Sequence, residues 1–287
     1  MKLHFMKYRK LSYWISGALV LISILSLAFK GLNYGIDFAG GISMEVKSVD
    51  AGYGVDKMRH DLAAFKPELQ SVDNDSVLIR VGLPRGATDA EQNERVREIK
   101  DILGNRVEYS QVQIVGPKIG GELVRGGILA VLVSFILMAV YIWIRYRGGY
   151  AIGSFVSLVL DFVLMFGFFS IVGLEFNQTA IAIILMGIGY SINDKVVNYD
   201  RIDENIKKYH KMPMEELIDL SVNEMLSRTI MTSITTILAL VGLFVFGGIA
   251  LRDFAIAMTF SVVMGTLTSI YISNVILYHF NLRETKY

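Results

Sequence analysis

The segment ILMGIGYSINDKVVNYDRIDENIKK, residues 184–208, begins as an apolar membrane helix and ends as a charged, water-facing segment. Asn193, Asp194 and Lys195 stand between the two parts, at a depth where hydrocarbon still surrounds a membrane helix. A charge at the centre of a bilayer costs about 2.5–3.5 kcal/mol on insertion scales, so an ionisable residue at that depth usually serves a function. The segment therefore predicts a membrane-spanning helix that carries a functional site.

The composition agrees with a membrane protein. The chain has 287 residues, of which 53% are hydrophobic, and it has no cysteine, which excludes disulfides and thiolate chemistry. Its charges crowd into residues 2–10, 45–108, 195–228 and 281–286. This segregation is typical of a polytopic α-helical membrane protein with one water-soluble insert. No basic stripe interleaved with aromatic residues is present, so we expect no nucleic-acid partner.

Stretches of about 20 apolar residues predict transmembrane helices. Six are found, at residues 11–29, 124–144, 150–172, 177–197, 229–246 and 254–280. The first lacks an A-x-A cleavage site and is expected to remain as an anchor.

Lysine and arginine in short loops mark the cytoplasmic side of a membrane protein. They lie before the first span, between the second and third, between the fourth and fifth, and after the last. Both termini are therefore expected in the cytoplasm. The predicted domains are residues 1–31 (N-terminus and first span), 32–123 (an extracytoplasmic domain) and 124–287 (the other five spans, with a cytoplasmic loop at about 199–228).

The insert is predicted to be a small α+β domain. Residues 41–47 alternate like a strand, and residues 54–66 carry apolar side chains at helical spacing. Two strands joined by Asn74 and Asp75 follow, then a helix opened by the capping box Thr88-x-x-Glu91 and ended by Gly104, then a last strand at 106–115. The order βαββαβ predicts a ferredoxin-like fold, which by itself assigns no function.

Motifs for common enzyme chemistry are missing. The sequence has no complete dinucleotide fingerprint, no phosphate-binding G-K-[ST] loop, no H-E-x-x-H and no G-x-S-x-G. We therefore expect neither an enzyme nor a bound cofactor or metal.

Three ionisable residues of the spans form the candidate site. Asp161 lies near the middle of the third span, one turn after Ser157. Asp194 lies in the fourth span, and Arg228 begins the fifth, where Thr232 continues its face. If the fourth and fifth spans are neighbours, Asp194 and Arg228 could pair. The arginine favours the ionised carboxylate and desolvation favours the protonated one, so a carboxyl group balanced between the two effects could bind and release a proton. Tyr190, Ser191 and Asn198 share the face of Asp194, and this polar stripe is expected to face the inside of the helix bundle. The supporting polar residues are Tyr190, Ser191, Asn193, Asn198 and Thr232.

Each assignment has a simpler alternative. Asp161 could be a structural hydrogen-bonding group, Asp194 a wetted residue near the cytoplasmic end, and Arg228 an interfacial side chain. Lys195 points to a different face from Asp194, and we expect its long stem to reach the cytoplasmic interface.

Four motifs together resemble the SecF family. They are GIDFAGG (35–41), VGPKIGGEL (115–123), GYSINDKVVNYDRIDEN (189–205) and LSRTIMTSITTI (226–237). The first two flank the insert and would suit hinges, although ordinary linkers would look similar. Their residues are Gly35, Asp37, Gly40, Gly41, Gly116, Pro117, Gly120 and Gly121.

The resemblance implies a function. SecF-like proteins belong to the resistance-nodulation-division superfamily, pair with a SecD-like subunit, dock on the SecYEG channel of the bacterial inner membrane and promote late steps of protein export. They contact unfolded polypeptide and lipid, and they use the proton-motive force and no bound cofactor. Asp194 matches the proton-coupling aspartate of the family, Arg228 its partner arginine, and Asp161 a further intramembrane aspartate. Lys195 and Asn198 depart from the family pattern, which favours small or apolar residues there.

Three alternatives remain open. A related proton-driven exporter of small molecules or lipids would share the intramembrane carboxylates. An intramembrane aspartyl protease would use Asp161 and Asp194 as a dyad, although the G-x-G-D element is absent. A passive assembly scaffold would need none of the charges.

Overall fold

The computed structural model describes residues 4–50, 52–71, 76–83, 87–146, 148–280 and 282, without the side chains of 89, 117–119 and 248–250. The chain divides into two compact units. One comprises Met1–Asn33, Val131–Glu175 and Thr179–Tyr287, and the other comprises Tyr34–Ala130 and Phe176–Gln178. The first is called the helical unit below, and the second the α+β unit.

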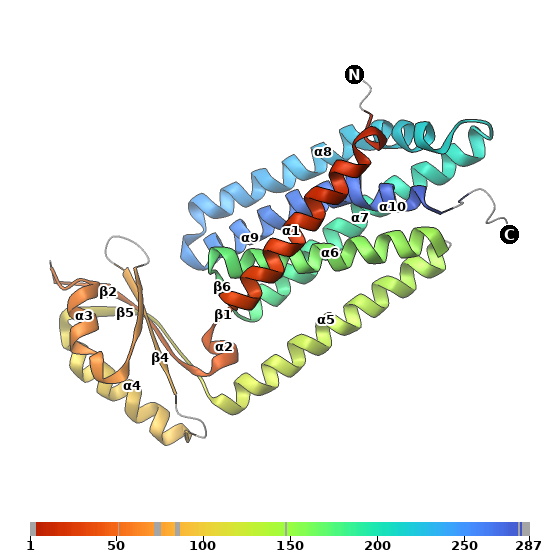
Figure 1. Cartoon of the computed structure of the whole chain (residues 1–287). Helices are drawn as coiled ribbons and strands as arrows, with labels where there is room; N and C mark the ends of the chain where they lie inside the picture. Colours follow the sequence, from red (N-terminus) through yellow and green to blue (C-terminus); the bar gives the residue numbers. More distant parts are fainter. Residues whose placement is uncertain are drawn as a thin grey trace. The chain divides into compact units, whose positions relative to one another are not determined.

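Long helices build the helical unit (Figure 1). Among the residues that the structure describes, six stretches are long and apolar enough to cross a membrane, the number predicted from the sequence. The helices are α1 (Arg9–Phe29), preceded by the 3-10 turn η1 (Met6–Tyr8), α5 (Pro117–Arg145), which is shared with the other unit, α6 (Gly148–Val172), α7 (Gln178–Lys208), α8 (Met214–Phe246) and α9 (Gly248–Leu267). The last helix continues through a π-helix, η4 (Thr268–Ser273), into α10 (Asn274–Tyr278).

The predicted cytoplasmic loop 199–228 is helical over most of its length. α7 runs on to Lys208 and α8 begins at Met214, directly after Pro213, so the connection is only residues 209–213. Ion pairs at helical spacing stabilise the charged part of α7: Arg201 contacts Glu204, and Lys207 contacts Asp203, each at 2.6 Å. The apolar pattern marks the membrane-embedded part of a helix, and charged turns of the same helix continue beyond it.

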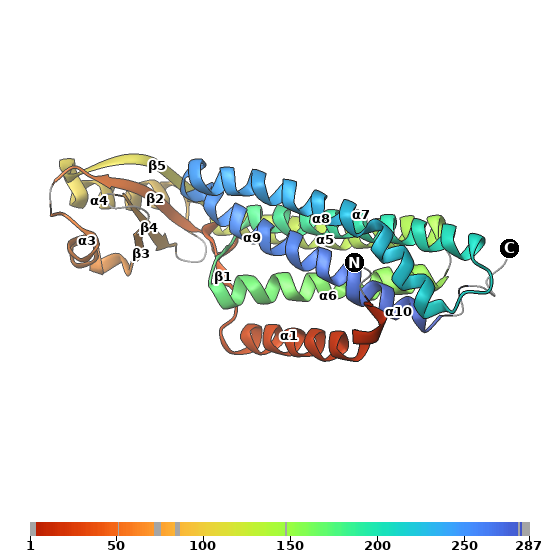
Figure 2. The ribbon, with the colours of Figure 1, turned by 90° about the horizontal axis from the view of Figure 1, so that it is seen from above.

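Small residues allow the helices to approach closely. A methyl group on Gly187 of α7 would collide with Ser261 of α9, and one on Gly265 of α9 would lie 3.1 Å from Cβ of Ser191. Gly167 of α6 meets Ser23 of α1 in the same way, and Figure 2 shows α1 beside α6. Such contacts are common between membrane helices, where small side chains let backbones come together. They bring α7 close to α9, and α6 close to α1.

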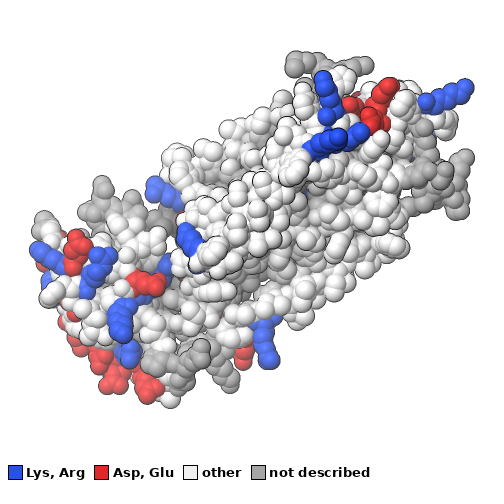
Figure 3. Space-filling view, viewed as in Figure 1, with Lys and Arg blue, Asp and Glu red and all other residues white. Residues whose placement is uncertain are grey.

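Charged side chains avoid the middle of the helical unit. On the face shown in Figure 3, most of this unit is uncharged, and Lys, Arg, Asp and Glu gather at the end that carries the N-terminus and the α7–α8 connection. Arg9 of α1 pairs there with Glu215 of α8, and the Met6 amide donates to Asp219 at 2.9 Å. The uncharged length is the part suited to hydrocarbon.

The α+β unit contains an antiparallel sheet with strand order β3-β4-β2-β5. Its elements are β2 (Gly41–Ser48), α3 (Val55–Asp61), η2 (Ala63–Phe65), β3 (Glu68–Ser71), β4 (Ser76–Gly82), α4 (Asp89–Leu103), η3 (Gly104–Arg106) and β5 (Val107–Val115). Short α2 (Ile36–Ala39) precedes β2, and β1 (Asn33–Tyr34) pairs with β6 (Glu175–Phe176). Asn74 and Asp75, predicted as the β3–β4 turn, lie outside the described residues.

The central strand β2 supplies the core of this unit. Ile42, Met44 and Val46 alternate along it and are all fully buried, and they belong to one cluster with Met58 of α3 and Ile99 of α4.

The predicted capping box is confirmed at the start of α4. The Glu91 amide donates to Thr88 Oγ1 at 3.4 Å, and the Thr88 amide donates to Glu91 Oε2 at 2.7 Å.

The two glycine motifs meet inside the α+β unit. Gly40 has a φ of 73°, which favours glycine. A methyl group on Gly41 would lie 2.9 Å from the Val81 carbonyl oxygen, and one on Gly120 would lie 3.2 Å from the backbone of Asp37 and Phe38. These glycines therefore allow close backbone packing, and a hinge role stays a prediction.

The other members of the motifs are placed as follows. The Gly35 amide donates to the Phe176 carbonyl at 2.9 Å, and Asp37 accepts from the Gln178 amide at 3.1 Å. Gly116 lies beside Gln92, and Gly121 has open space around it. Pro117 is the first residue of α5, and its side chain lies outside the described residues.

A polar cluster on the α+β unit predicts a pH dependence. Asp61 accepts from the Tyr53 hydroxyl at 2.8 Å and from Arg106 at 3.0 Å. These two donors, the tyrosine first, hold the pKa of Asp61 below its ordinary value of 3.8. A lowered folded-state pKa gives stability that is present above the unfolded pKa and is lost as the pH falls through the folded one. We expect the protection factors for hydrogen exchange in β2 and α3, which correct for the pH dependence of intrinsic exchange, to fall below about pH 4.

The control for this pH dependence is Asp61→Asn, which removes the titrating group. Its loss of protection over the same range should be smaller than that of the wild-type protein, measured by hydrogen-exchange mass spectrometry on the full chain. An identical acid response of the two proteins would contradict the assignment to Asp61.

Candidate functional site

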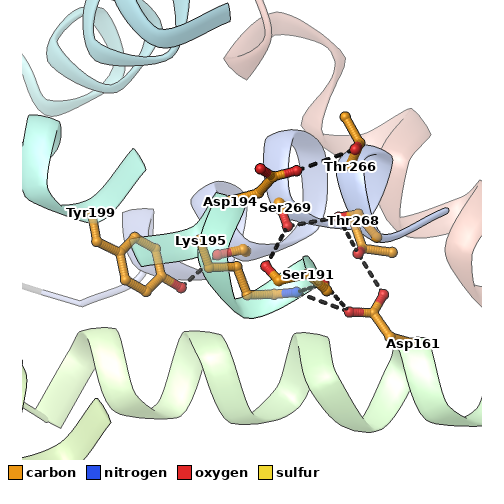
Figure 4. Close-up of polar contacts among 10 residues, drawn as sticks. Asp161, Ser191, Asp194, Lys195, Tyr199, Thr266, Thr268 and Ser269 are labelled. Atoms are coloured by element: carbon orange, nitrogen blue, oxygen red, sulfur yellow. Dashed lines mark hydrogen bonds and ion pairs between the residues drawn. The ribbon is translucent and has the colours of Figure 1, made fainter. Parts of the chain in front are cut away.

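Asp161 occupies the centre of a buried polar network. It lies on α6 and is 6% exposed. Ser191 of α7 and Thr268 of η4 donate their hydroxyls to it at 2.5 Å each, and the Lys195 ammonium lies 2.9 Å from it (Figure 4). Two elements, α7 and η4, thus supply donors to one carboxylate on α6. Ser154 and Ser157, on the same face of α6, make no hydrogen bond to Asp161 among the described residues, although both are buried.

Lys195 is fully buried, so the expectation that it reaches the cytoplasmic interface was wrong. Lys195 and Ser191 are one helical turn apart on α7, which puts both on the face toward α6, and the ammonium also contacts the Ser191 hydroxyl. Taking an ammonium out of water costs several kcal/mol, and only a close counter-charge with further hydrogen bonds offsets that cost. Asp161 supplies the counter-charge, and for this reason the side chain points inward.

The π-helix η4 forms the third wall of the network. Ser269 donates to the Ser191 carbonyl at 3.2 Å and to the Gly265 carbonyl at 2.6 Å. π-turns inside helices occur often at functional sites. Sequence reasoning missed Thr268 and Ser269, although the run of hydroxyl residues in TLTSIYIS, residues 266–273, was a visible signal in an otherwise apolar span.

Asp194 lies in a separate, smaller polar site. It is 8% exposed, and Thr266 of α9 donates to it at 3.2 Å. Thr266 in turn bonds to Ser233 of α8 at 2.8 Å. Asp194 borders a cavity of about 10 Å³ whose lining includes Tyr190 and Thr232, and a cavity of this size holds about one water molecule.

Arg228 does not form the expected pair with Asp194. It is exposed at the start of the membrane part of α8, and no ion pair of its guanidinium occurs within the described ranges. Thr232, one turn after Arg228, borders the same small cavity as Asp194, which places Arg228 near that carboxylate. The Thr232 hydroxyl bonds to the Arg228 carbonyl at 2.9 Å, one turn away.

The remaining polar residues of α7 divide between two faces. Asn198 is buried, and its amide nitrogen has no partner among the described residues. Tyr190 and Asn193 are exposed on the chain taken alone. The predicted inward stripe is thus correct for Ser191, Asp194 and Asn198 and wrong for Tyr190.

A protease dyad does not fit this geometry. Asp161 binds Lys195, Ser191 and Thr268, whereas Asp194 binds Thr266. No hydrogen bond joins the two carboxylates in the part of the chain that the structure describes. Two carboxylates that share one proton must be in direct contact.

Family comparisons identify the chain. The model "Protein export membrane protein SecD/SecF, C-terminal" matches residues 95–283, and the SecD/SecF GG motif matches residues 25–50. The chain belongs to the SecF family. The protein translocase subunit SecF of Rickettsia bellii is 42% identical over 283 residues, covering 95% of this chain and 91% of that protein. SecF of Rickettsia felis is 42% identical over 290 residues, covering 98% and 92%.

Solved structures agree with the family. A crystal structure of SecDF from Thermus thermophilus, described as a translocon-associated membrane protein, aligns with a TM-score of 0.84 at 32% identity over 96% of this chain. SecDF in a super-membrane-facing form aligns with a TM-score of 0.69 over 97% of this chain. In both cases the chain spans 38% of the length of the SecDF chain. The protein is therefore a multi-pass membrane protein and an accessory subunit of the Sec protein translocase.

Proposed function

We propose that the chain is the SecF-like half of a SecD–SecF assembly that uses the proton-motive force to promote late steps of protein export. The observation that carries this proposal is the presence of two buried carboxylates in membrane helices, each held differently. Asp161 is neutralised by Lys195, whereas Asp194 has one hydroxyl donor, a water-sized cavity and Arg228 nearby. Asp194 is therefore the group whose charge a proton changes most directly.

The energy available matches this task. Each proton that crosses the field supplies about 2.3 kcal/mol per 100 mV. Conformational states of proteins commonly differ by a few kcal/mol, so a few protons suffice to bias one. Protonation of Asp194 would remove its attraction to Arg228, and deprotonation would restore it. α7 and α8 would repack in each cycle, and this movement would reach the α+β unit through the chain segments that flank it.

A SecD-like partner would cover the exposed polar face of α7. Asn193 is exposed at a depth where a lone amide would face lipid. A partner helix would shield this amide and complete the site. The fused SecDF chains, of which this chain spans 38%, support the same arrangement.

The remaining partners and the topology are part of the same proposal. We infer that the assembly works in the bacterial inner membrane, contacts the SecYEG channel, unfolded polypeptide and lipid, and keeps both termini in the cytoplasm. The α+β unit would be an extracytoplasmic domain with a ferredoxin-like fold, which its strand order β3-β4-β2-β5 supports.

Arg228→Gln tests the proposal. Without this positive charge, deprotonated Asp194 loses the arginine as its counter-charge, so export should no longer accelerate when a proton gradient is imposed on membrane vesicles. We expect a loss of most of the gradient-dependent rate. The measurement is preprotein export with and without an uncoupler in otherwise identical vesicles.

The matched control is Arg252→Gln, which removes an exposed arginine at the opposite end of the neighbouring helix α9. It should export as the wild-type protein does, and both variants should co-purify with the SecD-like subunit. Normal gradient-dependent export by Arg228→Gln would refute the coupling and would favour a passive scaffold.

A further inference from the structure

The Lys195 ammonium is surrounded by carboxylate and hydroxyl oxygens. It lies 2.9 Å from Asp161 Oδ2 and touches the Ser191 hydroxyl, and Thr268 binds the other oxygen of the same carboxylate at 2.5 Å. Carboxylate and hydroxyl oxygens are the ligands that hard metal cations prefer. The subsite would thus suit a small monovalent cation if the ammonium were not there.

The ammonium cannot leave this position without breaking the network. Lys195 is 0% exposed, and Figure 4 shows its side chain extending from α7 to Asp161. Its ion-pair partner is Asp161 on α6, and the next charged group along α7 toward the membrane centre is Asp194. Asp161 and Lys195 neutralise each other, which leaves no net charge for a second cation to balance.

We infer that Lys195 determines the coupling ion: its tethered ammonium replaces a diffusible sodium ion beside Asp161 and restricts the chain to protons at Asp194. This inference rests on the proposed coupling function, but the subsite itself can be tested by binding alone. A small residue at position 195 would vacate the subsite, and sodium could then enter as the counter-charge of Asp161.

Thermal unfolding of the full chain in detergent tests the inference, with sodium chloride compared with choline chloride at equal ionic strength. The wild-type protein should show the same melting temperature in both salts. Lys195→Ser should gain a sodium-specific rise of about 2 to 4 °C for each tenfold increase of sodium above the dissociation constant. Lys195→Met fills the space without a charge and should show no sodium effect. Lys195→Ser combined with Asp161→Asn should lose the effect, because the carboxylate is gone.

Sodium-specific stabilisation of the wild-type protein, or none in Lys195→Ser, would overturn the inference, and so would equal effects in Lys195→Ser and Lys195→Met. If Lys195→Ser does not accumulate as folded protein, the amount of folded protein obtained from cells grown in high-sodium medium tests the inference instead. Rescue by sodium chloride but not by choline chloride supports the inference, and no rescue refutes it. The two proposals can fail separately. If sodium stabilises Lys195→Ser while Arg228→Gln still shows gradient-dependent export, the cation subsite is supported and the coupling at Asp194 is refuted.

Discussion

Asp161→Asn is expected to lower the free energy of unfolding by about 3–5 kcal/mol, because it leaves a buried ammonium without its counter-charge. Lys195 is fully buried, and Asp161 is its ion-pair partner. The variant must either keep a buried charge or force Lys195 to release its proton, and both states cost free energy. Chemical unfolding of the purified full chain in detergent measures the loss.

Lys195→Met supplies the control for this effect. A double variant of Asp161→Asn with Lys195→Met has no buried charge, and replacing a buried pair by neutral residues of similar volume is often neutral. We expect the double variant to recover most of the stability that Asp161→Asn loses, so that the double-mutant cycle gives a large coupling energy. Additive losses would show that Asp161 and Lys195 do not form the pair described above.

Asp194→Asn is expected to abolish gradient-dependent export while the protein stays folded. The substitution keeps the size of the side chain, and its amide oxygen can still accept the Thr266 hydroxyl, so the contact that holds position 194 is retained. Only the ability to gain and lose a proton disappears. The measurement is the ratio of export rates in membrane vesicles with and without the proton gradient, which should fall to about one.

Asp203→Asn is a matched control on the same helix. Asp203 pairs with Lys207 on the charged extension of α7, where both side chains are largely exposed. Surface pairs of this kind contribute little to stability, so the variant should retain the gradient response. Full gradient-dependent export by Asp194→Asn would remove Asp194 from the coupling step.

Hydrophobic patterning was sufficient to predict the six spans, and the Thr88-x-x-Glu91 motif was sufficient to predict the capping box. The periodicity of a single helix also placed Ser191 and Asp194 on buried faces. It could not show that Lys195 faces Asp161, because a helical wheel does not tell which neighbour lies against each face. The Asp161–Lys195 pair depends on the packing of α6 against α7, and Gly187 and Gly265 permit α7 to approach α9 closely. No sequence pattern predicted the π-helix, because it differs from an α-helix only in that its hydrogen bonds join residues five positions apart instead of four.

The π-helix η4 determines the directions in which the side chains of the following helix, α10, point. An α-helix advances by about 100° per residue, so one extra residue in a wider turn rotates everything that follows by about that angle. Asn274 and Tyr278 therefore face directions that an unbroken α-helix would not give them. Thr268 begins this turn and also binds Asp161, so a change of charge at Asp161 acts on the element that fixes the rotation. If the Thr268–Asp161 hydrogen bond were lost and the π-turn became α-helical, α10 would rotate about its own axis. This rotation would not require the helix to move along the membrane normal.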